Sequence, residues 1–187
     1  MKELTNIKKN YATPRKTEIS DVVNEIKIDA NDLIIKENVV VVLTNDGYLK
    51  KVSKKSFASS EESTGLKPGD FVIDMYDTIN TNKLVIITSM GNYMFIPIHE
   101  IINCKWKELG KHISNYVSIH PDDNVVKSFV ITDDNIEQEV VIYSKLGMVK
   151  RTKLGDFIVS RYSKLFTSMK LKDNDKIVSA SIVNDKN

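Results

Sequence analysis

One pattern occurs three times along the chain, and it limits the folds that the chain can adopt. Each copy is an apolar run, a turn centred on glycine and a second extended run. The copies are NVVVVLT-NDG-YLKKVS from Asn38, KLVIITS-MGN-YMFIPI from Lys83, and EVVIYS-KLG-MVKRTK from Glu139. Because glycine readily adopts the positive φ that a tight hairpin turn requires, each copy predicts a β-hairpin around Gly47, Gly91 or Gly147.

A second element recurs in step with the hairpins. Its copies are GDFVIDMY (69–76), DNVVKSFVI (123–131) and DKIVSASIV (175–183). Each begins with polar turn residues and continues into a β-branched run, which places Val72, Val126 and Val178 at equivalent positions. Repeats spaced like Gly47, Gly91 and Gly147, with about four strands each, are typical of propeller-like blades, because one blade alone cannot bury both faces of its sheet. An ordinary β-sandwich with coincidental hairpins is less favoured, because two elements recur in the same order.

The N-terminal region differs from the repeats. Leu4 and Ile7 stand at helical spacing and Pro14 ends the pattern, which predicts a short helix or an extended segment. We therefore expect an all-β protein with a helix tail and connector over residues 1–38. A propeller-like domain of about three blade units plus a final strand follows over residues 39–187.

Composition excludes several classes of protein. Among 187 residues, 41% are hydrophobic and 28% are charged, and no apolar run approaches the ~20 residues of a membrane span. The N-terminus lacks the apolar core of a signal peptide, so a cytoplasmic location without membrane contact is expected. The single cysteine, Cys104, excludes an internal disulfide and a cysteine-rich metal site.

The basic residues predict a partner more clearly than the net charge of +2 does. Among 27 Lys and Arg residues, only Arg15, Arg151 and Arg161 are arginines. Lysine is a hydrated point charge that attracts phosphate, whereas the arginine fork suits bidentate reading of guanine. Any binding of nucleic acid should therefore be largely independent of base sequence.

The strands after the hairpin glycines supply the candidate DNA-binding residues. They are Lys50, Lys51, Lys54 and Lys55 in the first copy and Lys145, Lys150, Arg151 and Lys153 in the third. A repeating fold should present these groups on one rim, as a curved basic track suited to a bent duplex. The second copy is uncharged, so Asn92 and Tyr93 are its candidate polar contacts.

The acidic residues cluster elsewhere in the sequence, and they are expected to lie apart from the basic track. They are Glu61, Glu62, Asp74 and Asp77 in one repeat and Asp133, Asp134, Glu137 and Glu139 in another. The alternative is that the lysines only keep exposed strands soluble. In that case the rim of the domain would bind an acidic protein partner or none.

No catalytic constellation is predicted. Tyr162 in SRYSK is expected to be a structural or surface residue, and His99, His112 and His120 lack metal-ligand spacing. The acid pairs Asp122–Asp123 and Asp133–Asp134 stand in turn contexts without a nucleophile. The chain alone is therefore not expected to be an enzyme or to hold a cofactor.

The segments YATPRKTEI (11–19) and EIKIDANDLIIKENVVVVLTNDGYLKKVSKKSF (25–57) are similar to one known family. They resemble the junction between the coiled coil and the C-terminal domain in the A subunits of bacterial type IIA topoisomerases, gyrase and topoisomerase IV. The resemblance implies a β-pinwheel in which each hairpin belongs to one blade. It also implies duplex DNA as a partner, with an A-subunit dimer, a B subunit, ATP and Mg engaged through other domains.

One stretch separates the two members of that family. Gyrase A subunits carry a basic, glycine-rich box after the first hairpin, where this chain has ASSEESTGLKPGD (58–70) with Glu61 and Glu62. By resemblance the box wraps DNA for negative supercoiling, so its absence implies topoisomerase IV, which unlinks and relaxes DNA. A gyrase domain with a degenerate box and a protein-interaction propeller remain the alternatives.

Overall fold

The computed structural model describes residues 2–14, 16–17, 34–58 and 64–183. The chain divides into two compact units, Met1–Asp32 and Leu33–Asn187. The first contains helix α1 (Lys2–Tyr11), which confirms the predicted N-terminal helix and buries none of its side chains. Most of the predicted connector, residues 18–33, lies outside the described residues. Over the described ranges, no helix is long and apolar enough to cross a membrane.

The second unit is built from antiparallel strands. They are β1 (Asn38–Thr44), β2 (Tyr48–Ser53), β3 (Val72–Ile79), β4 (Lys83–Thr88), β5 (Asn92–Pro97), β6 (Lys111–His112), β7 (Val125–Ile131), β8 (Glu139–Ser144), β9 (Val149–Lys153), β10 (Phe166–Thr167) and β11 (Ile177–Val183). The short helices are α2 (Lys54–Ala58), η2 (Ile98–Glu100), η3 (Ile113–Asn115) and η4 (Leu154–Phe157). The all-β class is therefore confirmed.

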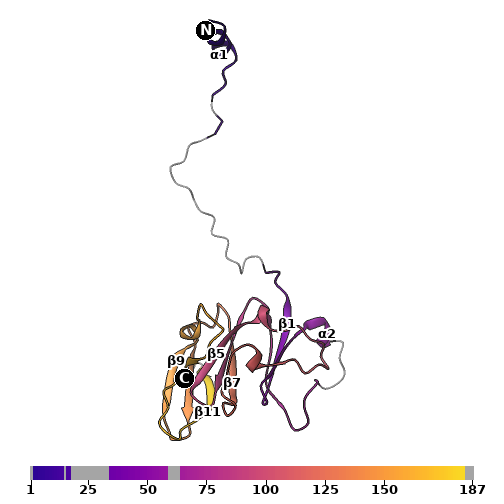
Figure 1. The fold of residues 1–187 in the computed structure, drawn as a ribbon, viewed down its shortest axis with the longest axis vertical. Helices are drawn as coiled ribbons and strands as arrows, with labels where there is room; N and C mark the ends of the chain where they lie inside the picture. The colour runs from indigo at the N-terminus through magenta and orange to yellow at the C-terminus, as the bar shows by residue number, and fades with distance from the viewer. Residues whose placement is uncertain (1, 15, 18–33, 59–63, 184–187) are drawn as a thin grey trace. The chain divides into compact units, whose positions relative to one another are not determined.

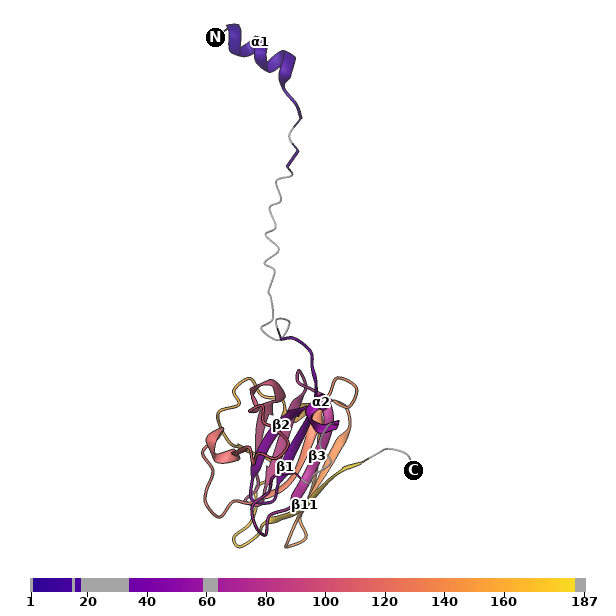
Figure 2. The same ribbon diagram turned by 90° about the vertical axis from the view of Figure 1, so that its right-hand side faces the viewer.

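Three sheets form the blades of this unit. Blade 1 has the strand order β3-β1-β2-β6, blade 2 has β10-β5-β4-β7, and blade 3 has β11-β8-β9. Figure 1 shows them side by side in chain order, from β1 through β5 and β7 to β9 and β11. Figure 2 looks onto blade 1, with β3, β1 and β2 in front. This arrangement is the predicted propeller-like array.

The blades do not coincide with the sequence repeats. The fourth strand of blade 1, β6, comes after the hairpin of blade 2, and the fourth strand of blade 2, β10, comes after the hairpin of blade 3. Over the described residues, blade 3 has three strands. The expectation of about four strands per repeat is therefore correct for blades 1 and 2, but one strand of each comes from the next repeat.

The three hairpins are built alike. Gly47, Gly91 and Gly147 have φ values of 82°, 84° and 83°, so all three turns use the left-handed region that glycine favours. Counting outward from these turns, Lys50, Met94 and Lys150 occupy the same register position. The hairpin prediction is confirmed in all three copies.

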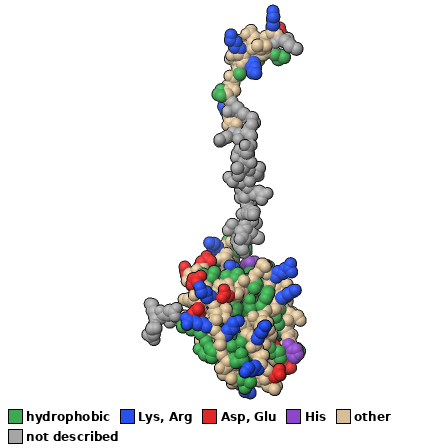
Figure 3. Space-filling model, turned by 90° about the vertical axis from the view of Figure 1, so that its left-hand side faces the viewer, with side chains coloured by type: hydrophobic (Ala, Val, Ile, Leu, Met, Phe, Trp, Pro, Cys, Tyr) green, Lys and Arg blue, Asp and Glu red, His purple; other side chains and the backbone are tan. Residues whose placement is uncertain are grey.

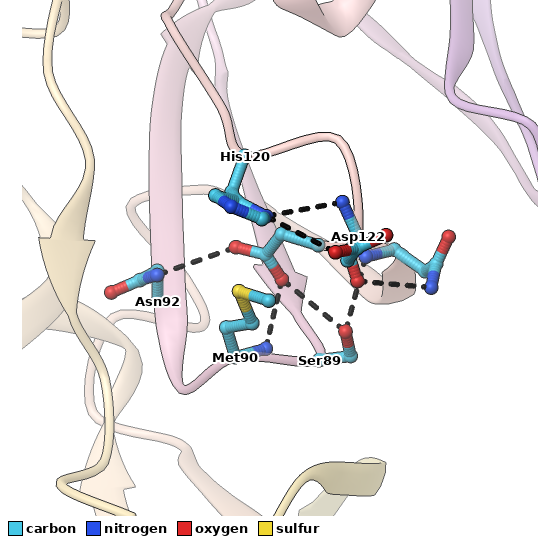
Figure 4. Close-up of polar contacts among 7 residues, drawn as sticks. Ser89, Met90, Asn92, His120 and Asp122 are labelled. Carbon is cyan, nitrogen blue, oxygen red and sulfur yellow. Dashed lines mark hydrogen bonds and ion pairs between the residues drawn. The ribbon is translucent and has the colours of Figure 1, made fainter.

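An aspartate fastens each hairpin turn to the strand that follows. Asp70 accepts a hydrogen bond from the N–H of Asp46 (2.9 Å), Asp123 from that of Met90 (2.8 Å), and Asp175 from that of Leu146 (2.9 Å). The Asp123 carboxylate also accepts hydrogen bonds from the side chains of Ser89 and Asn92, and Figure 4 shows Ser89, Met90 and Asn92 at this middle turn. The residue before each glycine is thus tied to the third strand of its blade. We name these contacts the aspartate clamps.

The predicted alignment of the third strands, β3, β7 and β11, is wrong by one residue. Thr44 pairs with Val72, Thr88 with Val125, and Ser144 with Ile177. The residues equivalent to Val72 are therefore Val125 and Ile177, each two positions after its aspartate, and not Val126 and Val178. In each pair the register shifts by one residue at this point, as in a β-bulge, so the alternating pattern alone misplaces the strands by one position.

The clamp of blade 3 makes stability sensitive to acid. Burial alone would raise the pKa of Asp175, but hydrogen bonds from the Ser144 side chain and from the N–H groups of Leu146, Lys176 and Lys145 lower it overall. A lowered folded-state pKa gives stability that is present above the ordinary aspartate pKa of about 3.9 and is lost as the pH falls through the folded value. We expect Asp175→Asn to flatten the loss of unfolding free energy below about pH 4 in urea titrations. An unchanged acid limb would contradict this role.

The core lies between the blades. One buried cluster joins blades 1 and 2 through residues such as Leu43, Leu49 and Ile86, and a second joins blades 2 and 3 through residues such as Tyr93 and Ile142. Each interior sheet face is therefore covered by its neighbour, as the repeat argument requires.

A polar contact fixes blade 1 against blade 2. The buried Asp74 on β3 accepts hydrogen bonds from the N–H (2.7 Å) and the hydroxyl (2.8 Å) of Ser128 on β7 and pairs with Lys127. The Tyr76 hydroxyl donates to the Ser128 carbonyl (2.6 Å), and burial raises the pKa of Tyr76 to about 12. Charge and hydrogen bonds together hold the two blades in one register.

Candidate nucleic-acid interface

Lys50 is a buried structural residue. Its side chain is 1% exposed, and its Nζ donates to the carbonyls of Trp106 (2.7 Å) and Glu108 (2.5 Å). The ammonium also lies 5.3 Å from the centre of the Trp106 ring, and burial lowers the pKa of Lys50. Because its donors are already occupied inside the protein, we remove Lys50 from the proposed DNA contacts.

The other blade 1 candidates differ in exposure. Lys51 is half-buried and donates to the His99 carbonyl (3.0 Å). Lys54 and Lys55 lie on α2 and are exposed, with Lys54 paired to Asp77 at 2.5 Å. Lys50 and Lys51 do not lie on the predicted exposed rim because β6 and the chain before it cover β2.

The blade 2 candidates are mainly internal. Tyr93 is 7% exposed and packs edge-on against Phe157, with ring centres 4.9 Å apart. Asn92 is half-buried and its Nδ2 donates to Asp123 (3.3 Å), so it serves the aspartate clamp (Figure 4). Tyr93 is therefore removed from the proposed contacts, and Asn92 has a structural role of its own.

The blade 3 candidates all remain at the surface. Lys145, Lys150, Arg151 and Lys153 are exposed, and Lys150 Nζ donates to the Ser168 carbonyl (2.6 Å). Arg151 pairs with Glu139, and Lys153 pairs with Glu137 at 2.6 Å. Exposed ion pairs of this kind contribute little to stability, and their members readily change partners. These cations therefore remain accessible to phosphate.

The expected separation of acidic from basic groups is wrong at these strands. Asp77 pairs with Lys54, and Glu137 and Glu139 pair with Lys153 and Arg151. Glu139 on β8 is a sheet neighbour of Arg151 on β9, and Lys54 on α2 reaches Asp77 on β3, which sequence order alone does not reveal.

A further set of exposed cations lies in the connection that runs from blade 3 back over blade 2. It comprises Arg161, Lys164, Lys170 and Lys172. Between Ile158 and Lys172 the chain, IVSRYSKLFTSMKLK, has no acidic residue. The sequence analysis considered only the hairpin strands and therefore missed these residues. The absence of acidic residues from this run could have indicated a basic surface. The connection over blade 1 carries a similar but weaker set, Lys105, Lys107 and Lys111, interrupted by Glu108.

The structure brings β9 against the connection at Ser168. A cavity of about 490 Å³ at this contact is lined by the basic Lys150, Arg151 and Lys153, by Thr167 and Ser168, and by the acidic Glu139 and Asp156. We define the basic surface of blades 2 and 3 as Lys145, Lys150, Arg151, Lys153, Arg161, Lys164, Lys170 and Lys172. Figure 3 looks from the side of blade 3 and shows Lys and Arg spread over this face, with Asp and Glu also present.

Other candidate chemistry is not assembled. Within the part of the chain that the structure describes, no group of three or more His, Cys, Asp or Glu residues could hold a metal ion. Tyr162 is exposed on the connection, and Asp123 serves its turn, in line with the turn role predicted for the acid pairs.

Lys50 provides a test of this division between structural and binding lysines. We expect Lys50→Met, which introduces the residue that blade 2 has at the equivalent position, to leave affinity for duplex DNA within about twofold. It should lower the unfolding free energy by about 1–3 kcal/mol, because the carbonyls of Trp106 and Glu108 lose their donor. Fluorescence anisotropy and urea denaturation measure the two quantities. A large loss of DNA affinity in a folded variant would return Lys50 to the interface.

The fold and this surface agree with one family of proteins. The chain belongs to the family described as the DNA gyrase C-terminal domain, a β-propeller, whose model matches residues 38–60, 82–132 and 138–184.

Within that family, the named relatives are A subunits of topoisomerase IV. The A subunit of DNA topoisomerase 4 from Bacillus subtilis is 33% identical over 98% of this chain, and that from Staphylococcus epidermidis is 37% identical over 95%. The chain spans 23% and 22% of the lengths of these proteins, less than a quarter of each.

Solved structures support the same placement. A crystal structure of the C-terminal domain of DNA topoisomerase IV has a TM-score of 0.75 and 33% identity, covering 80% of this chain and 47% of that one. The C-terminal domains of ParC from E. coli (16% identity, TM-score 0.63, 58% of that chain covered) and of DNA gyrase A (24%, 0.54, 49%) share the fold, and each covers 80% of this chain. The resemblance drawn from the sequence is confirmed, and so is its assignment to the topoisomerase IV branch.

Proposed function

We propose that this propeller binds duplex DNA for a topoisomerase IV A subunit, through the basic surface of blades 2 and 3. The observation that carries the proposal is the acid-free connection Ile158–Lys172, which adds four exposed cations beside those of β9. By holding and bending a DNA segment, the domain would influence which duplex crossings reach the cleavage domain in decatenation and relaxation.

The chemistry of the surface favours contact with the phosphate backbone. Six of its eight cations are lysines, which act mainly as point charges, and one of its two arginines, Arg151, already pairs with Glu139, so little base reading is expected. Nearby carboxylates would be displaced from their lysines by the denser charge of DNA, at little cost because the pairs are exposed. Lys54 and Lys55 on blade 1 extend the proposed track, with Lys51 a weaker contributor because it is half-buried.

The remaining activities of such an enzyme would belong to other parts of the longer protein. We propose that regions outside this chain carry DNA cleavage, the use of ATP and Mg, the A-subunit dimer contacts and the binding of the B subunit. The enzyme would act on the bacterial chromosome in the cytoplasm. The chain itself would be a binding domain without catalytic residues.

A competition experiment tests the proposal against a protein-binding propeller. The chain is bound to a labelled duplex of about 40 base pairs and titrated with unlabelled duplex or with polyglutamate of equal total charge. We expect the duplex to compete much more strongly, because DNA carries a dense and regular line of charge along one curved surface. Equal competition by polyglutamate, or no binding of DNA at low salt, would favour an acidic protein partner instead.

A further inference from the structure

One short segment of the connection that runs from blade 3 back over blade 2 is exposed along its whole length. It comprises residues 160–164, SRYSK, in the irregular stretch between η4 and β10. Every residue of this segment is exposed, including the large Tyr162 at 41%, and no run of exposed residues in the described part of the second unit is longer. None of the five side chains packs into the domain, so all of them can meet a partner.

The segment carries an arginine whose charge is not engaged. The basic surface of blades 2 and 3 has two arginines, Arg151 and Arg161. Arg151 pairs with Glu139, whereas no described residue forms an ion pair or a hydrogen bond with the Arg161 side chain. The connection around Arg161 also lacks acidic residues from Ile158 to Lys172. Of the two arginines, Arg161 is therefore the one whose guanidinium can bind a ligand without first leaving a carboxylate.

The shape of the segment favours the minor groove of duplex DNA over the major groove. The major groove is about 12 Å wide and admits a helix or a two-stranded ribbon, whereas the minor groove is about 6 Å wide. Residues 160–164 form neither a helix nor a strand, and Ser160 and Ser163 on either side of the Arg161–Tyr162 pair are small. Single irregular arms that carry arginine commonly enter the minor groove.

The chemistry of arginine suits the same groove. Runs of A·T pairs narrow the minor groove and strengthen its negative potential, which attracts inserted cations. A guanidinium is more weakly hydrated than an ammonium and presents its donors in a plane, so it enters a confined groove more readily than lysine does. The lysines of the surface are better suited to phosphates on the outside of the duplex.

We propose that residues 160–164 enter the minor groove of the bound duplex, and that Arg161 makes this contact favour narrow grooves rich in A·T pairs. The inference rests on the proposed DNA binding and adds to it a readout of DNA shape. Lys164, in the same segment, contacts a phosphate beside the groove. The preference is modest, because the other seven cations of the surface bind phosphates whatever the base sequence.

The test compares two duplexes of about 40 base pairs at one fixed, low salt concentration, with binding to the whole chain followed by fluorescence anisotropy. One duplex has A-tracts at its centre and the other is rich in G·C pairs. The unaltered chain should bind the A-tract duplex about fivefold more tightly. Arg161→Lys keeps the positive charge, so it should reduce the preference to within about twofold and change the affinity for the G·C-rich duplex little.

Two controls accompany this comparison. Arg151→Lys changes the other arginine of the surface in the same way, and it should leave the preference unchanged. A third duplex has the A-tract sequence with 2,6-diaminopurine in place of adenine. This base adds to the minor groove the amino group that guanine has there and leaves the major-groove edge as in adenine, so the third duplex should bind like the G·C-rich one.

The outcomes distinguish this inference from the proposed function. Failure of the unaltered chain to bind any of the duplexes would contradict both. Equal affinity for the A-tract and G·C-rich duplexes, or tighter binding of the G·C-rich one, would overturn the groove contact alone. A preference that survives in Arg161→Lys, or that the diaminopurine duplex retains, would overturn it as well.

Discussion

Replacing Arg161, Lys164, Lys170 and Lys172 by glutamate is expected to lower affinity for duplex DNA by about a hundredfold or more at low salt, since several phosphate contacts are lost and repulsion replaces them. All four side chains are exposed on a connection that runs over the outside of blade 2, so the variant should fold. The loss should shrink as salt rises, because counterion release drives the binding. Fluorescence anisotropy with a duplex of about 40 base pairs measures it directly.

The control for this variant changes net charge equally at another place. Lys2, Lys8, Lys9 and Lys16 belong to the first compact unit, and their replacement by glutamate alters total charge by the same amount. We expect a much smaller loss of affinity from this set. Equal losses in the two variants would mean that overall charge, and not the basic surface of blades 2 and 3, governs binding.

Gly91→Ala is expected to lower the unfolding free energy by about 3 kcal/mol or more. The residue has φ of 84°, and its added Cβ would meet the Met169 carbonyl at 2.4 Å, so strain and a backbone clash combine. The strand that completes blade 2 would have to move away. Urea denaturation followed by circular dichroism gives the value.

Gly147→Ala separates the two causes. Its φ of 83° is the same, but nothing described lies near its Cβ, so only the backbone strain of about 1–2 kcal/mol should remain. The difference between the two variants then measures how tightly β10 covers the blade 2 turn. Equal destabilisation would show that this close approach has no energetic weight.

The hairpins were predictable because their signal is local. A glycine between two extended runs fixes the turn at Gly47, Gly91 and Gly147, and the β-branched strands follow from residue type alone. The third strands were also foreseen, but their register was misplaced by one position. The aspartates two residues before Val72, Val125 and Ile177 would have given the correct alignment.

The fourth strands were not predictable from local pattern. β6 and β10 are two residues each, Lys111–His112 and Phe166–Thr167, too short to show alternation. They also pair with the preceding repeat, so their position depends on contacts that are distant in sequence. For that reason Lys50 and Lys150 looked equivalent, although a covering segment buries the first and none of the described residues buries the second.

The most direct test of the central claim is the salt dependence of duplex binding by the unaltered chain. With roughly four simultaneous phosphate contacts, log K against log salt should fall with a slope of about −3 to −4, and the four-glutamate variant on the blade 2 connection should give a shallower line. A slope near zero, or an equal slope in the variant, would contradict DNA binding through the basic surface of blades 2 and 3.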